Sequence, residues 1–219
     1  MKARFTLPDV SAFAEAAEIQ ERLASEVRLE PNARVAKIAG VDASYRSGRT
    51  WGAAVLMDTF GKVIETAVTG PLEVEFPYVP GFLSWRECPA AARALEMLTN
   101  DADCILVDGH GLLHPRLCGL ACVIGLMFDR CTVGCAKTPW RSEWSEPGEQ
   151  RGDWSPVFLD GRLLGATVRT RTGVAPVWVS PGHKCDVEGA VNIVLEVSRT
   201  RIPEPLRLAH LAAKAASSR

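Results

Sequence analysis

The order of the elements that the sequence predicts indicates an α/β fold with a central mixed sheet in a single domain. Three strands with tight turns come first, then a helix, and then a strand, a helix and another strand. Strands joined by tight turns pair antiparallel, whereas strands on either side of a connecting helix pair parallel. With 219 residues, of which 47% are hydrophobic and 23% are charged, the chain can bury one good-sized core.

Composition argues against several classes of protein. No run reaches the roughly eighteen apolar residues of a membrane-spanning helix. The N-terminus lacks the charged-then-apolar pattern of a secretory signal. The seven cysteines are odd in number, which favours reduced thiols and a cytoplasmic location. The net charge of −1 gives no overall attraction to nucleic acid, although residues 151–219 hold 10 basic and 6 acidic residues. We therefore expect a monomer that makes no membrane contact and meets charged partners only at local sites.

The spacing of four cysteines, Cys118, Cys122, Cys131 and Cys135, allows two interpretations. Zinc sites usually carry paired cysteines with a two-residue gap on a knuckle turn. Here one pair, at a spacing of four, falls in a helix-like stretch and the other in a strand-like stretch. We therefore favour small buried side chains over a zinc site.

Periodicity and turn residues predict the individual elements. Residues 1–30 contain a packing helix at 9–29, with apolar residues on one face and glutamates and arginines on the other. The predicted strands are 35–45, 51–58, 62–69, 105–107, 132–136, 154–159, 162–170 and 176–180. The other predicted helices are 84–98, which Ser84 would cap, 116–128, 186–198 and 204–214, with a ragged tail at 215–219. Residues 138–153 are predicted to form a long surface loop.

Residues 76–87 break this pattern. Pro77 and Pro80 bracket Tyr78 and Val79, which makes a stiff loop with an aromatic residue at its tip. Tyr78 could be a core side chain beneath the loop, or a wedge that enters a stack of bases. Taken alone, the segment favours the core side chain.

Two aspartates follow apolar stretches in predicted strands. Asp42 ends the first such stretch, and Asp108 follows the strand 105–107. Asp108 by itself could cap the next loop. The element order, however, is that of a ribonuclease H-like domain, in which the first strand lies beside the strand that follows the first helix. The two carboxylates would then meet, and Mg²⁺ prefers one or two carboxylates with phosphate oxygens and water. This arrangement predicts metal-dependent phosphodiester hydrolysis.

Other polar residues could complete such a site. Glu87 could bind a second metal or orient the attacking water, His210 could act near the nucleophile or leaving group, and Lys137 could offset charge on the phosphate. Each also has a structural explanation, as a helix-cap residue, a helix histidine and a solvated strand end, respectively. His183 and Lys184 precede the helix 186–198, where backbone amides favour a phosphate.

Several motifs together resemble the endonuclease V family. They are GVDASY (40–45), PYVPGFLSWRE (77–87), VDGHGLLHPR (107–116), GCAK (134–137), VSPGHK (179–184) and PEPLRLAH (203–210), and they run in order from about residue 35 to residue 210. The resemblance implies a Mg²⁺-dependent repair nuclease of ribonuclease H-like fold, for which Mn²⁺ is an expected substitute. It would recognise deaminated bases in DNA, chiefly hypoxanthine. It would cut the second phosphodiester bond on the 3′ side and leave a 3′-hydroxyl and a 5′-phosphate.

The resemblance also implies residue roles. Asp42 and Asp108 would bind the metal, with Glu87 and His210 completing the catalytic group. Residues Pro77, Tyr78, Val79 and Pro80 are similar to the strand-separating wedge, which reverses the preference for a buried Tyr78. The pocket for a flipped base would be walled by Gly81, Leu83, Gly109 and Gly119. His114 and Lys137 would lie near the scissile backbone. The sequence departs from the family pattern at Thr138-Pro139-Trp140, after Lys137.

Other functions are weighed against this one. An inosine-specific ribonuclease of the same fold would differ in a contact to the 2′-hydroxyl. A catalytically silent binder of damaged nucleic acid would have no use for the metal-binding carboxylates. A phosphatase of small molecules would leave the wedge unexplained.

Overall fold

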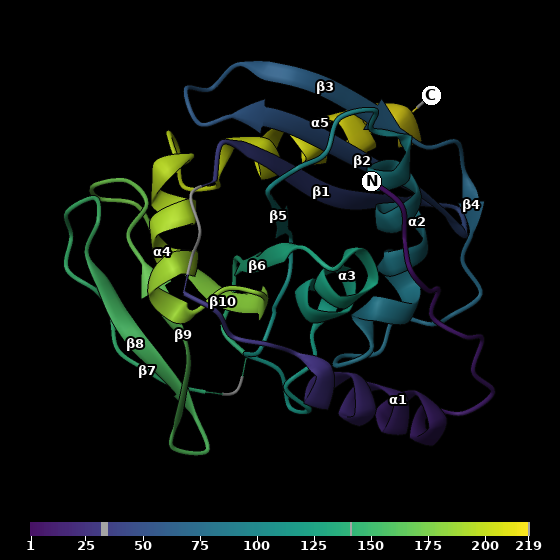
Figure 1. Ribbon diagram of the computed structural model, residues 1–219, viewed down its shortest axis with the longest axis horizontal. Helices are drawn as coiled ribbons and strands as arrows, with labels where there is room; N and C mark the ends of the chain where they lie inside the picture. Colours follow the sequence, from purple (N-terminus) through teal and green to yellow (C-terminus); the bar gives the residue numbers. More distant parts are fainter. Residues whose placement is uncertain (32–34, 141, 219) are drawn as a thin grey trace.

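The computed structural model describes residues 1–31, 35–140 and 142–218. In this part of the chain, helices cover both faces of a mixed sheet (Figure 1). The strands are β1 (Lys37–Arg46), β2 (Arg49–Asp58), β3 (Val63–Val68), β4 (Leu72–Glu73), β5 (Cys104–Val107), β6 (Cys131–Ala136), β7 (Glu143–Trp144), β8 (Trp154–Leu159), β9 (Arg162–Val168) and β10 (Val177–His183). The helices are α1 (Phe13–Glu26), α2 (Leu83–Met97), α3 (Leu120–Phe128), α4 (Val187–Glu196) and α5 (Glu204–Ser217). No helix among these residues is both long and apolar enough to cross a membrane.

The strand order confirms the predicted mixed sheet. It runs β3-β2-β1-β5-β6-β10-β9-β8-β7, and β4 pairs with β2. The first strands form an antiparallel meander, and β1 then pairs parallel with β5, as β5 does with β6. The helices α2 and α3 make the crossovers that parallel pairing needs. The first strand therefore lies beside the strand that follows α2, as predicted.

The central strands are apolar on both faces because helices cover both. Ala39, Val41 and Ile105 point into a core that α1, α2 and α3 close. Ile38 and Leu106 alternate with them and point into a second core, which α4 and α5 close. Successive side chains of a strand point to opposite faces of the sheet, so neighbouring residues pack against different helices.

Several element boundaries differ from the predicted ones. The helix α5 continues to Ser217 instead of ending at 214, β10 reaches His183 rather than 180, and the predicted loop 138–153 contains β7. The helix α1 spans 13–26 rather than 9–29, and the backbone at Val27 is extended. The helix α3 begins at Leu120 rather than 116, because Leu117 has a φ of 52°, which a right-handed helix cannot contain. The prediction that Ser84 caps α2 is wrong, since Phe82 is the N-cap and Ser84 is buried in the first turn.

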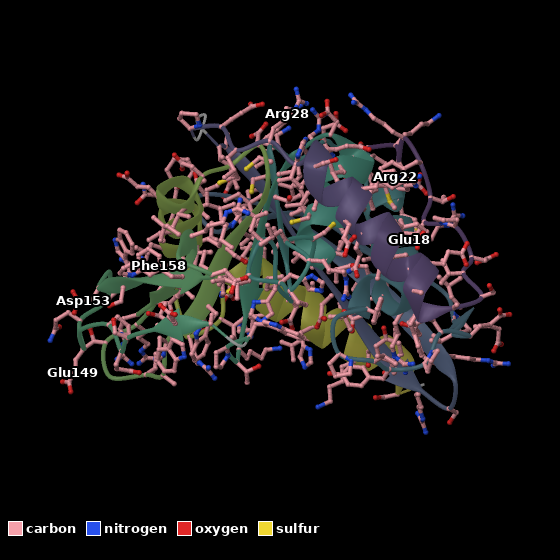
Figure 2. The ribbon with its side chains drawn as sticks, turned by 90° about the horizontal axis from the view of Figure 1, so that it is seen from below. Glu18, Arg22, Arg28, Glu149, Asp153 and Phe158 are labelled. Atoms are coloured by element: carbon pink, nitrogen blue, oxygen red, sulfur yellow. The ribbon has the colours of Figure 1, made fainter. Side chains whose placement is uncertain are left out.

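The polar face of α1 is exposed as predicted. Figure 2 shows Glu18 and Arg22 on the outer side of this helix, far from Glu149 and Asp153 beside the β8–β9 hairpin. The opposite face of α1 buries Ala16 and Leu23, together with the polar Gln20.

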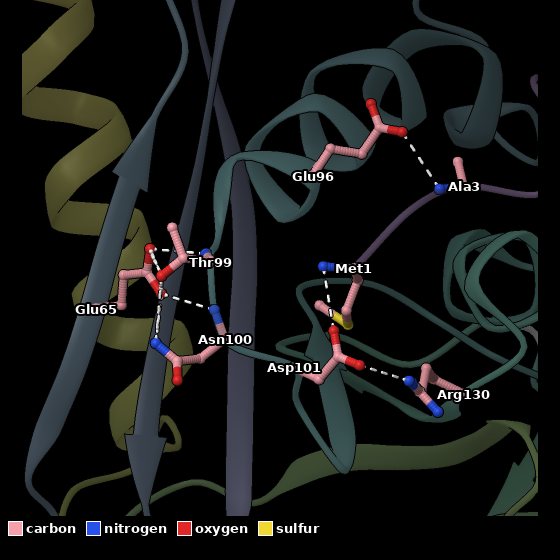
Figure 3. A network of polar contacts seen from close by, with 8 residues as sticks. All are labelled: Met1, Ala3, Glu65, Glu96, Thr99, Asn100, Asp101 and Arg130. Atoms are coloured by element: carbon pink, nitrogen blue, oxygen red, sulfur yellow. Dashed lines mark hydrogen bonds and ion pairs between the residues drawn. The ribbon is translucent and has the colours of Figure 1, made fainter.

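Hydrogen bonds and ion pairs hold the loop that enters β5 (Figure 3). Asp101 accepts from the N-terminal amine of Met1 at 3.2 Å and from Arg130 at 2.9 Å. Glu65 on β3 accepts from the backbone N–H of Thr99 at 2.8 Å. This network lies at the N-terminal end of β5, whereas Asp108 follows the C-terminal end. It therefore fixes the strand at the end that is remote from Asp108.

The packing of α5 on β1 generates a test. A Cβ at Gly40 would lie 2.2 Å from the carbonyl carbon of Pro205, so Gly40→Ala must push the start of α5 away from the sheet. We expect it to destabilise the fold by about 1–3 kcal/mol, the usual cost of overpacking. Gly70→Ala is the matched control, since a Cβ there meets nothing within 4 Å. Urea denaturation of both variants measures this difference. Equal midpoints for Gly40→Ala and Gly70→Ala would contradict the close packing of α5 on β1.

Candidate active site

Asp42 and Asp108 lie side by side because β1 and β5 are parallel neighbours. Val41 is in register with Val107, and the N–H of Asp108 donates to the carbonyl of Val41 at 3.4 Å. Val41 and Val107 both point into the core under α2 and α3. The aspartates that follow them therefore lie next to each other, Asp42 within β1 and Asp108 just beyond the end of β5.

The Asp42 carboxylate is buried and held in a fixed orientation. Its Oδ1 accepts from the N–H of Ala43 at 2.8 Å, and its Oδ2 accepts from Nδ1 of His210 on α5 at 2.7 Å. Burial and the nearby charge of Asp108 raise the pKa of Asp42, and the bond from His210 opposes that rise. The half-exposed His210 ring thus turns its Nε2 away from Asp42.

Glu87 reaches the aspartates from α2. Burial, and then the charges of Asp42 and Asp108, raise the pKa of Glu87 to about 8. The hydroxyl of Tyr45 lies beside this carboxyl and opposes the rise. The Arg86 guanidinium lies over the Tyr45 ring, 4.3 Å from its centroid. The sequence motifs did not predict this support. The alternation of β1, which places Tyr45 on the same face as Val41, toward α2, was the available signal.

Lys137 follows β6 and binds Asp108 directly. Its Nζ lies 2.5 Å from Oδ2 of Asp108. Burial alone would lower the pKa of Lys137, but the ion pair with Asp108 outweighs it and raises the pKa. A charged ammonium therefore stands beside the carboxylates at neutral pH.

The carboxylates suit a hard divalent cation. In the described residues, no three His, Cys, Asp or Glu side chains already surround one point as metal ligands do. The donor chemistry nevertheless fits, because Mg²⁺ takes one or two carboxylates and leaves its other positions to water and phosphate. Burial, and then the charges of neighbouring carboxylates, raise the pKa values of both Asp42 and Glu87. A cation between them would relieve that repulsion.

A cavity of about 430 Å³ joins these groups to the predicted recognition residues, and we call it the central cavity. Its walls include four predicted catalytic residues and most of the predicted wedge and pocket: Asp42, Glu87, Asp108, Lys137, Tyr78, Val79, Pro80, Gly81, Leu83, Gly109, Gly119 and His114. Pro77 lines a neighbouring groove instead. His110, Leu120 and Trp140 also line the central cavity, although the sequence predicted no role for them there.

Two glycines in the wall are there for steric reasons. Gly81 has a φ of 86°, a conformation that side chains disfavour. A Cβ at Gly119 would lie 2.2 Å from the carbonyl oxygen of His110. The backbone therefore forms this part of the wall, and its amides and carbonyls can be approached closely.

The loop with Tyr78 is exposed at its tip and fixed at its base. Tyr78 is 70% exposed, so it is not a core side chain. The Gly81 carbonyl accepts from Nη2 of Arg116 at 2.6 Å and lies 3.0 Å from Nε2 of His114. Arg116 in turn donates from Nε to the side chain of Gln20 at 2.7 Å. Gln20 is fully buried on α1, and a polar residue on an apolar helix face was the available sequence signal.

Two histidines in the wall are kept neutral at physiological pH. Burial, and then the charge of Arg116, lower the pKa of His114 to about 4. Burial also lowers the pKa of His110 to about 4. The ring of Trp140 lies against both, 5.8 Å from His114 and 6.4 Å from His110 between centroids.

His183 and Lys184 lie apart from the carboxylates, and their predicted contact with the nucleic-acid backbone stays a prediction. His183 pairs with Thr132 at the start of β6, whereas Lys137 follows the end of that strand. His183 is 2% exposed, and Lys184 forms an ion pair with Asp129 at 2.7 Å. At the start of α4, the carboxylate of Asp186 accepts from the N–H of Gly189 at 2.7 Å, where an anion was expected. Local sequence showed an accessible helix start but not these partners.

The sheet order and the carboxylate cluster define a ribonuclease H-like nuclease. A profile of the endonuclease V family matches residues 19–211. The endonuclease V of Methanothrix thermoacetophila is 44% identical over 198 residues, which cover 90% of this chain and 88% of that protein. The chain belongs to the endonuclease V family and is an endonuclease.

Solved structures agree with this assignment. The crystal structure of endonuclease V from Streptomyces avermitilis superposes with a TM-score of 0.92 at 34% identity, covering 100% of this chain and 98% of that one. The endonuclease V of Ciona intestinalis was solved with a 23mer DNA containing an inosine followed by a ribo-adenosine. It superposes with a TM-score of 0.84 at 25% identity, covering 94% of this chain and 97% of that one.

The raised pKa of Glu87 generates a pH prediction for the metal-free protein. The unfolded carboxyl ionises near its usual 4.5 and the folded one near 8. The folded state therefore binds more protons between these values, and its unfolding free energy falls as pH rises from about 4.5 to 8. We expect this loss to be smaller in Glu87→Gln, as measured by thermal unfolding in EDTA at pH 5 and pH 8. If the stability of both proteins depends on pH in the same way, Glu87 does not interact with the two aspartates.

Proposed function

We propose that this chain is a metal-dependent endonuclease that recognises deaminated bases in DNA, chiefly hypoxanthine, and hydrolyses the second phosphodiester bond on their 3′ side. The products are a 3′-hydroxyl and a 5′-phosphate. One observation carries the proposal: the carboxylates, the glycine walls and the exposed Tyr78 loop all border the central cavity. The inosine-containing DNA bound by the Ciona intestinalis relative supports the choice of lesion.

Recognition rests on the residues of the loop and of the glycine walls. Tyr78 enters the duplex beside the lesion and takes up the space of the extruded base, and Val79 and Pro80 keep the loop stiff. The extruded base enters the central cavity, where Gly81, Gly109 and Gly119 let backbone amides and carbonyls approach its edge. The contacts of Arg116 and His114 with Gly81 hold the loop and this wall in one arrangement.

Chemistry rests on the carboxylates and their neighbours. Asp42, Asp108 and Glu87 would hold Mg²⁺ or Mn²⁺, and such an ion would supply polarisation of the phosphate and a more acidic bound water. Lys137 keeps Asp108 in place and contributes positive charge beside the phosphate. Asp42 orients the His210 ring through Nδ1, so Nε2 can exchange a proton with the nucleophile or the leaving group.

A second candidate substrate is inosine-containing RNA. The DNA bound to the Ciona intestinalis relative carries a ribo-adenosine after its inosine. A 2′-hydroxyl can thus stand beside the lesion in a relative of this fold. A silent binder is disfavoured, because crowded carboxylates oppose an anionic backbone unless a cation lies between them.

We further propose a monomer in the cytoplasm. The cysteines in the described part of the chain are free, as a reducing compartment requires. The small net charge makes binding to nucleic acid dependent on local lysines and arginines, so it should weaken as salt rises.

Cleavage of matched oligonucleotides tests the function. DNA and RNA strands of one sequence, with one inosine or one guanosine, are incubated with Mg²⁺ or with EDTA. We expect a nick at the second phosphodiester bond 3′ to inosine in DNA, only with Mg²⁺. Asp108→Asn should slow it at least about a hundredfold, as loss of a metal ligand or its support does. Preferential cutting of RNA would favour the second candidate, and binding without cutting would contradict both.

The role of Tyr78 has a separate test. Tyr78→Ala should lower selectivity for inosine in duplex DNA by about tenfold or more, because the stacking that replaces the extruded base is lost. It should still cut inosine in single strands, where no partner base has to be displaced. The exposed Phe60→Ala, on the β2–β3 turn, is the matched aromatic control. Unchanged duplex selectivity would show that Tyr78 is no wedge.

A further inference from the structure

Trp140 is a flat aromatic wall of the central cavity that the proposed function leaves unused. It lines the cavity together with Tyr78, the glycines and two leucines. Tyr78 is largely exposed at the tip of its loop, whereas the Trp140 ring is partly buried against other side chains. The Trp140 indole is therefore an aromatic wall of the central cavity that is already in place before a ligand binds.

The position of the indole is fixed from several sides. Its ring lies 5.8 Å from His114 at an interplanar angle of 32°, which is a tilted stack. Its other neighbour, His110, meets it edge-on, at 6.4 Å and 79°. Pro139 restricts the backbone before it, and the Ser142 hydroxyl donates to the Trp140 carbonyl at 2.9 Å. Little freedom is lost when such a ring binds a ligand.

The remaining walls do not offer an equivalent surface. Gly81, Gly109 and Gly119 contribute backbone, which can meet the edge of a base through hydrogen bonds. Leu83 and Leu120 are apolar but branched, and they pack beside Gly109. A base also has two broad faces, and a planar ring covers such a face better than an aliphatic chain.

We infer that Trp140 stacks on the extruded base and gives the central cavity a preference for deaminated purines over uracil. A bicyclic hypoxanthine or xanthine covers more of an indole than a single-ring uracil does, so stacking favours the purine. This inference rests on the proposed function and names its preferred substrate class.

Steady-state cleavage of two matched duplexes tests the inference, one with deoxyinosine and one with deoxyuridine at the same position. Trp140→Ala should raise KM for the inosine duplex by about tenfold or more, the usual effect of losing one base–aromatic stack. We expect a smaller rise for the uracil duplex and little change in kcat for either. Trp140→Phe should recover most of the preference, and Trp140→Leu should not, because leucine is apolar without being planar.

Trp144→Ala is the matched control. Trp144 lies on β7 in the same stretch of chain, and its ring meets Trp178 edge-on at 5.2 Å rather than the central cavity. It should leave both KM values unchanged. Far-ultraviolet circular dichroism checks that each variant is folded, and the phenylalanine and leucine variants keep the comparison valid if the alanine variant is not.

The outcomes separate the two proposals. If the unaltered protein cuts inosine and folded Trp140→Leu keeps its KM and its ratio of inosine to uracil cleavage, the inference fails and the proposed function stands. A fall in kcat with unchanged KM would also overturn it, since Trp140 would then act on the chemical step. If the unaltered protein cuts neither duplex, the proposed function fails and takes the inference with it.

Discussion

Repulsion between like charges is the constraint on which the site depends. Parallel pairing of β1 with β5 brings Asp42 beside Asp108, and α2 adds Glu87 from the face that Val41 and Val107 occupy. Nothing local favours three carboxylates in one place. Burial, and then the charges of Asp42 and Asp108, raise the pKa of Glu87. Two apolar cores, one on each face of the central strands, stabilise the sheet enough to hold the arrangement. Such a cluster of carboxylates favours a bound cation, and a phosphate of the substrate can contact the same cation.

The same sheet edge also shapes the recognition surface. The segment after Asp108 packs so closely on β6 and β10 that a Cβ at Gly111 would lie 2.1 Å from the carbonyl oxygen of Pro181. Backbone rather than side chain therefore forms much of the wall beside the carboxylates. Contacts from Arg116 and His114 to Gly81 then tie this wall to the exposed Tyr78 loop. The carboxylates and the Tyr78 loop are thus connected through one set of packed segments, which under the proposed function would receive an extruded base and its backbone together.

Much of the fold and site could be predicted because the signals were local. Alternating and helical periodicity identified most elements, and the element order indicated that Asp42 and Asp108 would meet. Errors arose where a distant contact overrides a local signal. Ser84 has the spacing of a capping residue, but the chain starts α2 one residue earlier and buries it. Distant contacts also surround the start of α4, where Lys184 pairs with Asp129 and the Asp186 carboxylate accepts from the N–H of Gly189.

The sequence by itself determined the mixed α/β architecture, the aspartates that follow apolar strand residues and the stiff Tyr78 loop, because each depends on residues close together in the chain. Only the tertiary structure decided which side chains support them. Gln20 and Arg116 are far apart in sequence, yet they meet to hold Gly81. Trp140 becomes a wall of the central cavity only through His110 and His114. Such contacts depend on the packing of several elements at once, and no periodicity or spacing encodes them.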